Sequence, residues 1–264
     1  MPSSPRNRLR QLLNSVGLLR PLQAGIYWRT QFDPTSTHPR RVMRRFYEPF
    51  IKRGDLVFDI GANRGQRIDI FLELGAKIVA VEPQQACVDY IRQHFPSRNL
   101  VLIHKGLGSR DGELVEMNIC KELDSISSMS QDFLQQSRFA TQYGYAWEKS
   151  GKVELTTLDR LIATHGVPAF CKIDVEGYEV EVLSGLSQAL PCISFEYNRE
   201  FHQRSLECAA KLDALGSYHY NFGRAEPEHL MFAQWLTAAE LFNRLHEHTD
   251  NLLWGDIYAR RLSP

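Results

Sequence analysis

Two carboxylates on either side of a glycine turn have the types and the spacing of a nucleoside-binding site. The short apolar run Leu56–Ile60 contains Asp59 and leads into a turn that begins at Gly61. A second apolar run, Lys77–Val81, ends at Glu82, and the difference between positions 82 and 61 is 21. In nucleotide-binding folds a carboxylate at this place accepts the hydroxyls of a ribose. These residues therefore indicate nucleoside binding.

The glycine turn differs from the G-x-G-x-x-G turn of dinucleotide-binding proteins. Asn63 occupies the position of the second glycine, where the backbone of a dinucleotide-binding turn approaches the pyrophosphate. A ribose-binding acid beside a turn that obstructs a pyrophosphate favours S-adenosylmethionine and disfavours a nicotinamide cofactor. On these residues alone, a glycine turn in an unrelated α/β protein is the alternative.

Two further strand-like runs end in carboxylates that could act as general bases. Phe170–Asp174 is one such run, and Cys192–Phe195 is followed directly by Glu196. The carboxyl ends of parallel strands meet at one edge of a sheet, so we expect Asp174 and Glu196 to lie together beside the nucleoside. A carboxylate there can take the proton of an alcohol that attacks a methyl group.

Glu176 is a third candidate base, because it follows Asp174 by two positions. Its alternative role is to stabilise the N-terminus of a helix that starts near Tyr178. Crowded carboxylates could also hold a divalent metal that acidifies a hydroxyl. The spacing does not require a metal, and no metal ligands are assigned.

A sheet must position these carboxylates, and the order of the apolar runs predicts one. Strand-like runs alternate with helical stretches from residue 54 onward, which is typical of an open, doubly wound parallel sheet. A last strand over Leu252–Ala259 suggests an antiparallel edge strand. The third strand, residues 99–104, leads into Lys105, Gly106 and Leu107, a segment expected to wall an adenine ring.

The chain is expected to form one α/β domain over residues 54–264, which holds these carboxylates, with an N-terminal extension, residues 1–53. Leucines on one face of residues 7–20 predict a basic amphipathic helix. This helix could pack on the protein or a second subunit, or lie on a membrane surface. Residues 125–151 are rich in serine and aromatic side chains, which indicates a lid or insertion facing the substrate; ordinary surface packing is the alternative.

Charge and cysteine content limit the partners and the compartment. Residues 1–53 carry eleven Arg/Lys and two Asp/Glu, a net charge of +9, so the other residues, with 20 basic and 29 acidic side chains, carry −9. An acidic body disfavours nucleic acid as a partner. The five scattered cysteines lack metal-site spacing and favour a reducing, cytoplasmic setting, with peripheral membrane contact through the basic helix left open.

Three stretches of the sequence resemble the FkbM family of S-adenosylmethionine-dependent methyltransferases. They are Val57–Gln66 (VFDIGANRGQ), Val81–Pro83 (VEP) and Lys172–Glu179 (KIDVEGYE), of which the last is the most diagnostic. The resemblance covers residues 40–200 well, the C-terminal third in outline, and residues 1–38 not at all. Lys105-Gly106-Leu107 departs from the asparagine–alanine–leucine type of sequence expected there.

The resemblance implies a class I methyltransferase fold with a doubly wound, mostly parallel seven-stranded sheet. It also implies S-adenosylmethionine as cofactor and O-methylation of a hydroxyl on a sugar, glycan or secondary metabolite. Asp174, Glu196 and Glu176 are the candidate catalytic residues. The expected cofactor-binding residues are Asp59, Gly61, Ala62, Asn63, Gly65, Gln66, Glu82, Pro83, Gly106, Leu107 and Asp174.

Two other functions remain open from the sequence. A nucleic-acid methyltransferase could use the basic N-terminal arm for phosphate contacts. A protein that binds S-adenosylmethionine without catalysis would share the same cofactor residues. The sequence does not identify the methyl acceptor, its methylated position or the oligomeric state.

Overall fold

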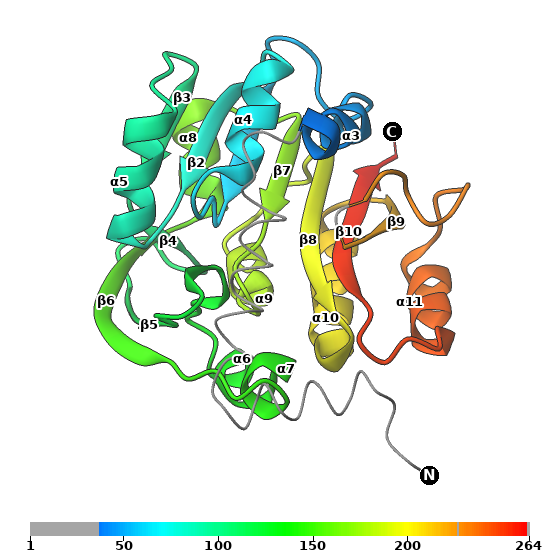
Figure 1. Ribbon diagram of the computed structural model, residues 1–264. Coiled ribbons are helices and arrows are strands. Elements are labelled where there is room, and N and C mark those ends of the chain that lie inside the picture. The colour runs from blue at the N-terminus through cyan, green and yellow to red at the C-terminus, as the bar shows by residue number, and fades with distance from the viewer. Residues whose placement is uncertain (1–36, 226, 263–264) are drawn as a thin grey trace.

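The computed structural model describes residues 37–225 and 227–262 (Figure 1). Seven strands form the main sheet, in the order β3-β2-β1-β7-β8-β10-β9. They are β1 Leu56–Ile60, β2 Lys77–Val81, β3 Leu100–Ile103, β7 Phe170–Ile173, β8 Cys192–Asn198, β9 Tyr218–Arg224 and β10 Trp254–Arg261. Neighbouring strands from β3 to β8 run parallel. The predicted doubly wound, mostly parallel seven-stranded sheet is confirmed.

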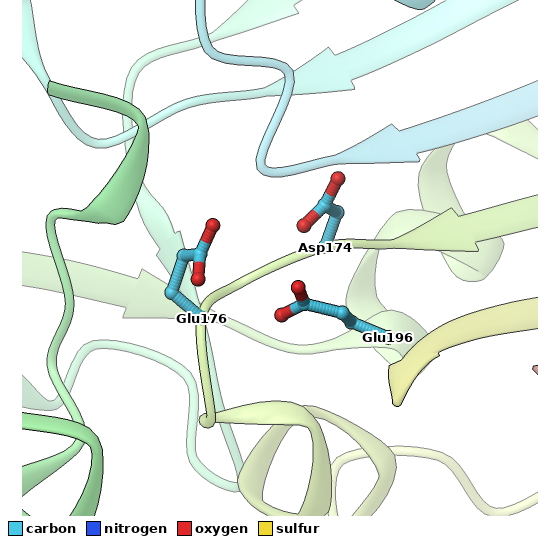
Figure 2. A group of neighbouring side chains, drawn as sticks. All are labelled: Asp174, Glu176 and Glu196. Carbon is cyan, nitrogen blue, oxygen red and sulfur yellow. The ribbon is translucent and has the colours of Figure 1, made fainter. Parts of the chain in front are cut away.

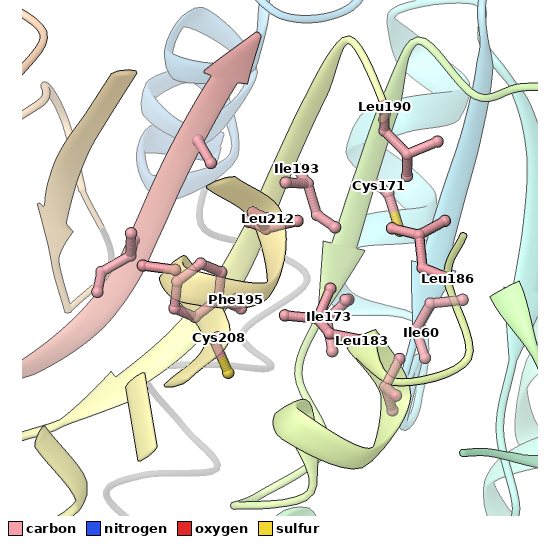
Figure 3. Packing of buried hydrophobic residues seen from close by; sticks show 14 of the residues in the cluster. Ile60, Cys171, Ile173, Leu183, Leu186, Leu190, Ile193, Phe195, Cys208 and Leu212 are labelled. Carbon is pink, nitrogen blue, oxygen red and sulfur yellow. The ribbon is translucent and has the colours of Figure 1, made fainter. Parts of the chain in front are cut away.

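The central strands are apolar on both faces because helices cover both sides of the sheet. One face packs against α3 Thr37–Tyr47, α4 Gln66–Glu73 and α5 Gln85–His94. The other packs against α8 Leu158–His165, α9 Glu179–Leu183, α10 His202–Leu215 and α11 Ala238–Glu247. Figure 3 shows part of this second interior, with Ile173 of β7 near Leu183 of α9 and Phe195 of β8 near Cys208 of α10.

The last strand is antiparallel as predicted, but it does not lie at the edge of the sheet. β10 pairs with β8 on one side and with β9 on the other, so β9 forms the edge. Both β9 and β10 are largely buried, and their apolar runs do not indicate which of them is outermost.

A smaller three-stranded sheet, in the order β4-β6-β5, covers the end of the main sheet where its parallel strands finish (Figure 1). Its strands are β4 Gly106–Leu107, β5 Leu114–Ile119 and β6 Glu148–Thr156. The first five residues of β6, residues 148–152, are polar and exposed, and its buried residues lie nearer its end. The chain between β5 and β6 forms η1 Asp124–Ile126, α6 Gln131–Gln136 and α7 Arg138–Thr141.

The packed body begins before the predicted domain boundary at residue 53. Met43, Phe46 and Tyr47 of α3 are buried in the same hydrophobic cluster as α4 and β1. Arg40 of α3 also forms an ion pair of 2.5 Å with Asp69 of α4. The predicted helix over residues 7–20 lies outside the described residues. Within residues 37–225 and 227–262, no helix is both long and apolar enough to cross a membrane.

Candidate active site

A cavity of about 370 Å³ opens at the carboxyl ends of β1, β2, β7 and β8. The strand order reverses at β1, which has β2 on one side and β7 on the other, and ligands of open α/β sheets bind at such a reversal. All but one of the predicted site residues line this cavity: Asp59, Gly61, Ala62, Asn63, Gln66, Glu82, Pro83, Gly106, Leu107, Asp174, Glu176 and Glu196. The exception is Gly65.

The carboxylate of Glu82 fixes the glycine turn at one end of the cavity. Its two oxygens accept the backbone N–H groups of Asn63 and Gln84, each at 2.8 Å. The residue is 2 % exposed, and burial raises the pKa of its carboxyl to about 7 although both N–H bonds lower it. Each carboxylate oxygen can accept more than one hydrogen bond, so capacity remains for two hydroxyls of a ribose.

Backbone conformation explains three residues of the turn. Gly61 has φ 79°, Asn63 has φ 47° and Gly65 has φ 83°, and all three values lie in the left-handed region. Asparagine tolerates this region better than most residues with a side chain. Gly61 also approaches the chain after β7 closely, because a Cβ atom built on it would lie 1.9 Å from the Asp174 carbonyl oxygen.

Gly61→Ala is therefore expected to destabilise the protein more than Gly112→Ala does. Gly112 has a similar φ of 77° with nothing within 4 Å of an added Cβ, so Gly112→Ala costs only the conformational strain of ~1–2 kcal/mol. Gly61→Ala adds steric overlap worth roughly 1–3 kcal/mol. Urea denaturation measures both changes, and equal losses would contradict the contact between the Gly61 turn and Asp174.

Two of the predicted glycines also meet a packing requirement. A Cβ on Gly65 would lie 2.7 Å from the Phe95 ring, which is away from the cavity lining. A Cβ on Gly106 would lie 2.6 Å from the Leu155 side chain of β6. Gly106 lines the cavity through its backbone, while its lack of a side chain accommodates Leu155. Leu155 lies close to Gly106 because β4 and β6 are neighbours in the small sheet, an arrangement that the sequence did not reveal.

Asp59 supplies a second buried acid beside the turn. It is 2 % exposed, and its Oδ2 atom has no hydrogen-bond partner among the described residues. Burial raises the pKa of this carboxyl to about 6, against the lowering effect of the Lys172 and Arg67 cations. An unpaired buried carboxylate that lines a cavity suits a cationic ligand group, such as the amino group of S-adenosylmethionine. These observations, with Glu82, fit that cofactor.

Asp174, Glu176 and Glu196 meet at the other end of the same cavity, and Figure 2 shows their carboxyl groups converging. One oxygen of each lies within 4.8 Å of the others. Burial and the neighbouring acids raise the pKa values of Glu176 and Glu196 well above their usual range. Each of these two residues also has a buried oxygen without a hydrogen-bond partner in the described structure.

Glu176 reaches this cluster through an unusual backbone conformation. Its φ of 52° is rare for a residue with a long side chain, and such outliers concentrate at functional sites. Ser128 donates a 2.7 Å hydrogen bond to its carbonyl oxygen. Glu179, the first residue of α9, fixes the loop before that helix, because its Oε1 accepts the backbone N–H groups of Val175 and Gly177.

Several residues at this end of the cavity were not expected from the sequence. Lys172 donates a 2.7 Å hydrogen bond to Asp174, and Asp256 of β10 lies near the same lysine. An isolated charge in a buried strand must find a partner, and that signal could have identified Lys172. Asn198 and Trp254 also line this end of the cavity, whereas Arg138, Phe139, Tyr143 and Tyr145, which line it too, belong to the predicted lid or insertion at residues 125–151.

Arg138 anchors the segment that carries these aromatic residues. It forms a buried ion pair of 2.5 Å with Glu200, and donates a 2.7 Å hydrogen bond to the carbonyl of Leu252, just before β10. Phe139 and Tyr145 extend from this segment into the cavity lining, and both pack in an aromatic cluster with Phe133. The segment therefore forms one wall of the cavity at the end where Asp174, Glu176 and Glu196 lie.

Three solved structures are similar to this chain, at low identity. The first is precorrin-6y C5,15-methyltransferase from Geobacter metallireducens GS-15, with 11 % identity, coverage of 86 % of this chain and 90 % of that chain, and a TM-score of 0.45. The second is a putative RNA methyltransferase from Pyrococcus horikoshii, with 8 % identity, coverage of 90 % of this chain and 89 % of that chain, and a TM-score of 0.42. The third is a TehB-like S-adenosylmethionine-dependent methyltransferase from Corynebacterium glutamicum, with 11 % identity, coverage of 91 % of this chain and 100 % of that chain, and a TM-score of 0.41. No curated protein matches the sequence.

A family comparison agrees with the motifs and with the sheet. The profile of the methyltransferase FkbM domain matches residues 59–239, which is more than half of the chain. The match begins at Asp59 and includes Glu82, Asp174 and Glu196. This chain therefore belongs to the methyltransferase FkbM domain family.

Proposed function

We propose that this protein methylates a hydroxyl oxygen of a sugar, glycan or other secondary metabolite, with S-adenosylmethionine as the methyl donor. The observation that carries the proposal is the cavity with the ribose-type acid Glu82 at one end and three carboxylates at the other. β1 lies between β2 and β7, so the strand ends that carry Glu82 and Asp174 are about 10 Å apart. A nucleoside held at Glu82 would extend across β1 toward Asp174.

The proposed chemistry is an in-line displacement at the methyl carbon. S-adenosylmethionine supplies an electrophilic methyl group whose bond to sulfur breaks, with the electron pair remaining on sulfur. Asp174 accepts the hydroxyl proton as the new oxygen–carbon bond forms, a contribution of typically ~10²–10⁴-fold in rate. Glu82 and the Gly61 turn orient the cofactor, and such positioning can supply ~7–11 kcal/mol of the barrier.

Glu176 and Glu196 are assigned to the acceptor. Their raised pKa values favour protonated carboxyl groups, which can both donate and accept hydrogen bonds to neighbouring hydroxyls. Aromatic side chains in the adjoining wall, among them Tyr145 and Trp254, offer flat surfaces to a sugar ring. Phosphate-bearing acceptors are disfavoured, since they would lie against this acidic cluster.

The experiment is methyl transfer from S-adenosylmethionine with a labelled methyl group to a panel of glycosides, glycans and hydroxylated metabolites. Mass spectrometry should detect a gain of one methyl group on a hydroxyl oxygen, and S-adenosylhomocysteine should form in equal amount. RNA serves as the comparison acceptor. Cofactor binding without transfer to any hydroxyl in a broad panel would favour a non-catalytic binding protein, and methylated RNA would favour the nucleic-acid alternative.

Affinity for S-adenosylmethionine is expected to increase as the pH rises through the region near 7. The carboxyl of Glu82 has a pKa of about 7 in the free protein, and only its ionised form can accept both ribose hydroxyls. Binding therefore lowers this pKa and releases a proton, so the dissociation constant should increase up to about tenfold for each pH unit below 7. Calorimetry in buffers of different ionisation enthalpy measures the released proton.

Glu82→Gln provides the control for this pH dependence. The glutamine keeps the side-chain shape and one acceptor oxygen but cannot titrate. Its residual pH dependence should centre near 6, where Asp59 ionises. An unchanged profile in Glu82→Gln would show that another group causes the pH dependence.

A further inference from the structure

Lys172 carries a positive charge in the middle of the sheet. It belongs to β7, which lies between β1 and β8, and its side chain is 2 % exposed. Lysine is almost never fully buried without an ionic partner, because burial of an isolated ammonium group is very unfavourable. The carboxylates around its ammonium group therefore indicate the role of this lysine.

Two carboxylates hold the ammonium group, and they differ in their exposure. Nζ lies 2.7 Å from Oδ2 of Asp174 and 3.7 Å from Oδ1 of Asp256. The Asp256 side chain is 10 % exposed and accepts a hydrogen bond from the hydroxyl of Tyr258. The Asp174 side chain is 38 % exposed and lines the cavity. Lys172 thus joins two carboxylates that both line the cavity, of which Asp174 is the more exposed.

The nearby charged and titratable groups come from all the elements packed around this pair. Lys172 faces both positive and negative groups, and although burial lowers its pKa, Asp174 and Asp256 raise it above the usual value. Asp174 faces mainly acids. Around the pair lie Tyr47 of α3, Asp59 of β1, Arg67 of α4, Glu176 and Glu179 after β7, Glu196 of β8, and Asp256 and Tyr258 of β10.

The three acids at the acceptor end therefore have different environments. The carboxylate of Asp174 is bonded to an ammonium group at 2.7 Å. Glu176 and Glu196 instead face one another and Asp174, and burial with this repulsion favours their protonated forms. A general base must be ionised before it can accept a proton. The ion pair thus distinguishes one carboxylate from its neighbours.

We propose that Lys172 is a positioning residue for the reaction, which holds the Asp174 carboxylate toward the cavity and keeps it in the proton-accepting form. This inference rests on the proposed function, in which Asp174 is the base. Lys172 itself does not need to touch the acceptor or the cofactor. Asp256, the less exposed of the two carboxylates, is the second ionic partner of the lysine.

The test measures the ionisation of Asp174 directly in protein labelled with [13C]aspartate and saturated with S-adenosylhomocysteine. The carboxyl signal of Asp174 is assigned by its loss in Asp174→Asn. In Lys172→Met its titration midpoint should rise by about 1–3 pH units, the usual effect of removing an adjacent opposite charge. Lys172→Arg, which keeps the charge, should restore most of the wild-type midpoint.

Asp256→Asn is the matched control, because it removes a charged partner from the same network. It should not raise the Asp174 midpoint, since it takes away a negative charge. If Lys172→Met does not fold, as judged by circular dichroism, Lys172→Gln carries the same expectation. An Asp174 midpoint that stays unchanged in a folded, uncharged variant would overturn the proposal.

Methyl transfer gives the second readout, with the hydroxyl acceptor found in the panel. The acid limb of single-turnover methyl transfer in Lys172→Met should move to higher pH together with the Asp174 midpoint. At a fixed pH below the midpoint, the rate should fall about tenfold for each pH unit by which the midpoint rises. The dissociation constant of S-adenosylmethionine is compared well above pH 7, where Asp59 stays ionised even though Lys172 no longer lowers its pKa, and there it should remain near the wild-type value. Parallel loss of rate and cofactor affinity would instead indicate a structural role and overturn the proposal.

The two readouts separate this inference from the proposed function. If wild-type protein binds S-adenosylmethionine but methylates no hydroxyl, the proposed function fails, while the carboxyl titration still decides the role of Lys172 toward Asp174. If wild-type protein is active and the titration does not move, only the inference about Lys172 fails.

Discussion

Asp174→Asn should lower kcat for methyl transfer by about 10²–10⁴-fold, the contribution expected of a well-placed general base. Asparagine has nearly the same shape as aspartate, and the backbone carbonyl of residue 174 can still lie close to Gly61. Binding of S-adenosylmethionine should therefore change little. Single-turnover kinetics with saturating cofactor measures the loss, and calorimetry measures cofactor binding on the same preparation.

Glu196→Gln is the matched variant for this measurement. Glu196 lies in the same cluster, but its raised pKa favours the protonated form, which the neutral glutamine imitates. Its effect on kcat should therefore be much smaller than that of Asp174→Asn, and its effect on the acceptor KM larger. Near-normal turnover in Asp174→Asn, or the larger kcat loss in Glu196→Gln, would remove Asp174 from the role of base.

Glu82→Ala should weaken the binding of S-adenosylmethionine by about 10²–10⁴-fold. Each hydrogen bond to a charged group contributes ~1.5–3 kcal/mol, and the proposed ribose contact has two of them. The substitution also leaves the buried N–H groups of Asn63 and Gln84 without their acceptor, so the glycine turn loses its fixed shape. Isothermal titration calorimetry measures the change in affinity.

Thermal unfolding of Glu82→Ala without ligand separates lost contacts from lost folding. A cooperative unfolding transition would show that the variant is folded, so that its lower affinity reports lost contacts with the cofactor. Glu82→Gln, which keeps one acceptor oxygen, should fall between the wild type and Glu82→Ala in affinity. Wild-type affinity in a folded Glu82→Ala protein would place the ribose elsewhere.

Much of the fold followed from the sequence because its core strands are short, mostly apolar runs that have an acid within them or directly after them. Such runs are typical of parallel strands with helices on both faces, and β1, β2 and β7 have this pattern. β6 was only partly predictable, since residues 148–152 are polar and exposed and pair with β5 through the backbone. The position of β10 inside the sheet depends on its pairing with β8 and β9, which its own residues do not encode.

The predicted acids meet in one cavity because the carboxyl ends of parallel strands lie at one edge of the sheet. The contact between Lys172 and Asp256 could not be predicted from the sequence, because it joins β7 to a strand that follows much later in the chain. The aromatic wall depends in the same way on the ion pair between Arg138 and Glu200. Gly65 shares its left-handed conformation with Gly61, yet its neighbour Phe95 shows that conformation alone does not identify a ligand contact.

The central claim is that a single cavity at the strand ends binds S-adenosylmethionine, and calorimetry of the wild-type protein tests it most directly. We predict binding of one S-adenosylmethionine per chain, competition by S-adenosylhomocysteine, and no binding of NADH, whose pyrophosphate meets Asn63. A folded protein that gives no heat with S-adenosylmethionine, or that binds NADH in its place, would contradict the account.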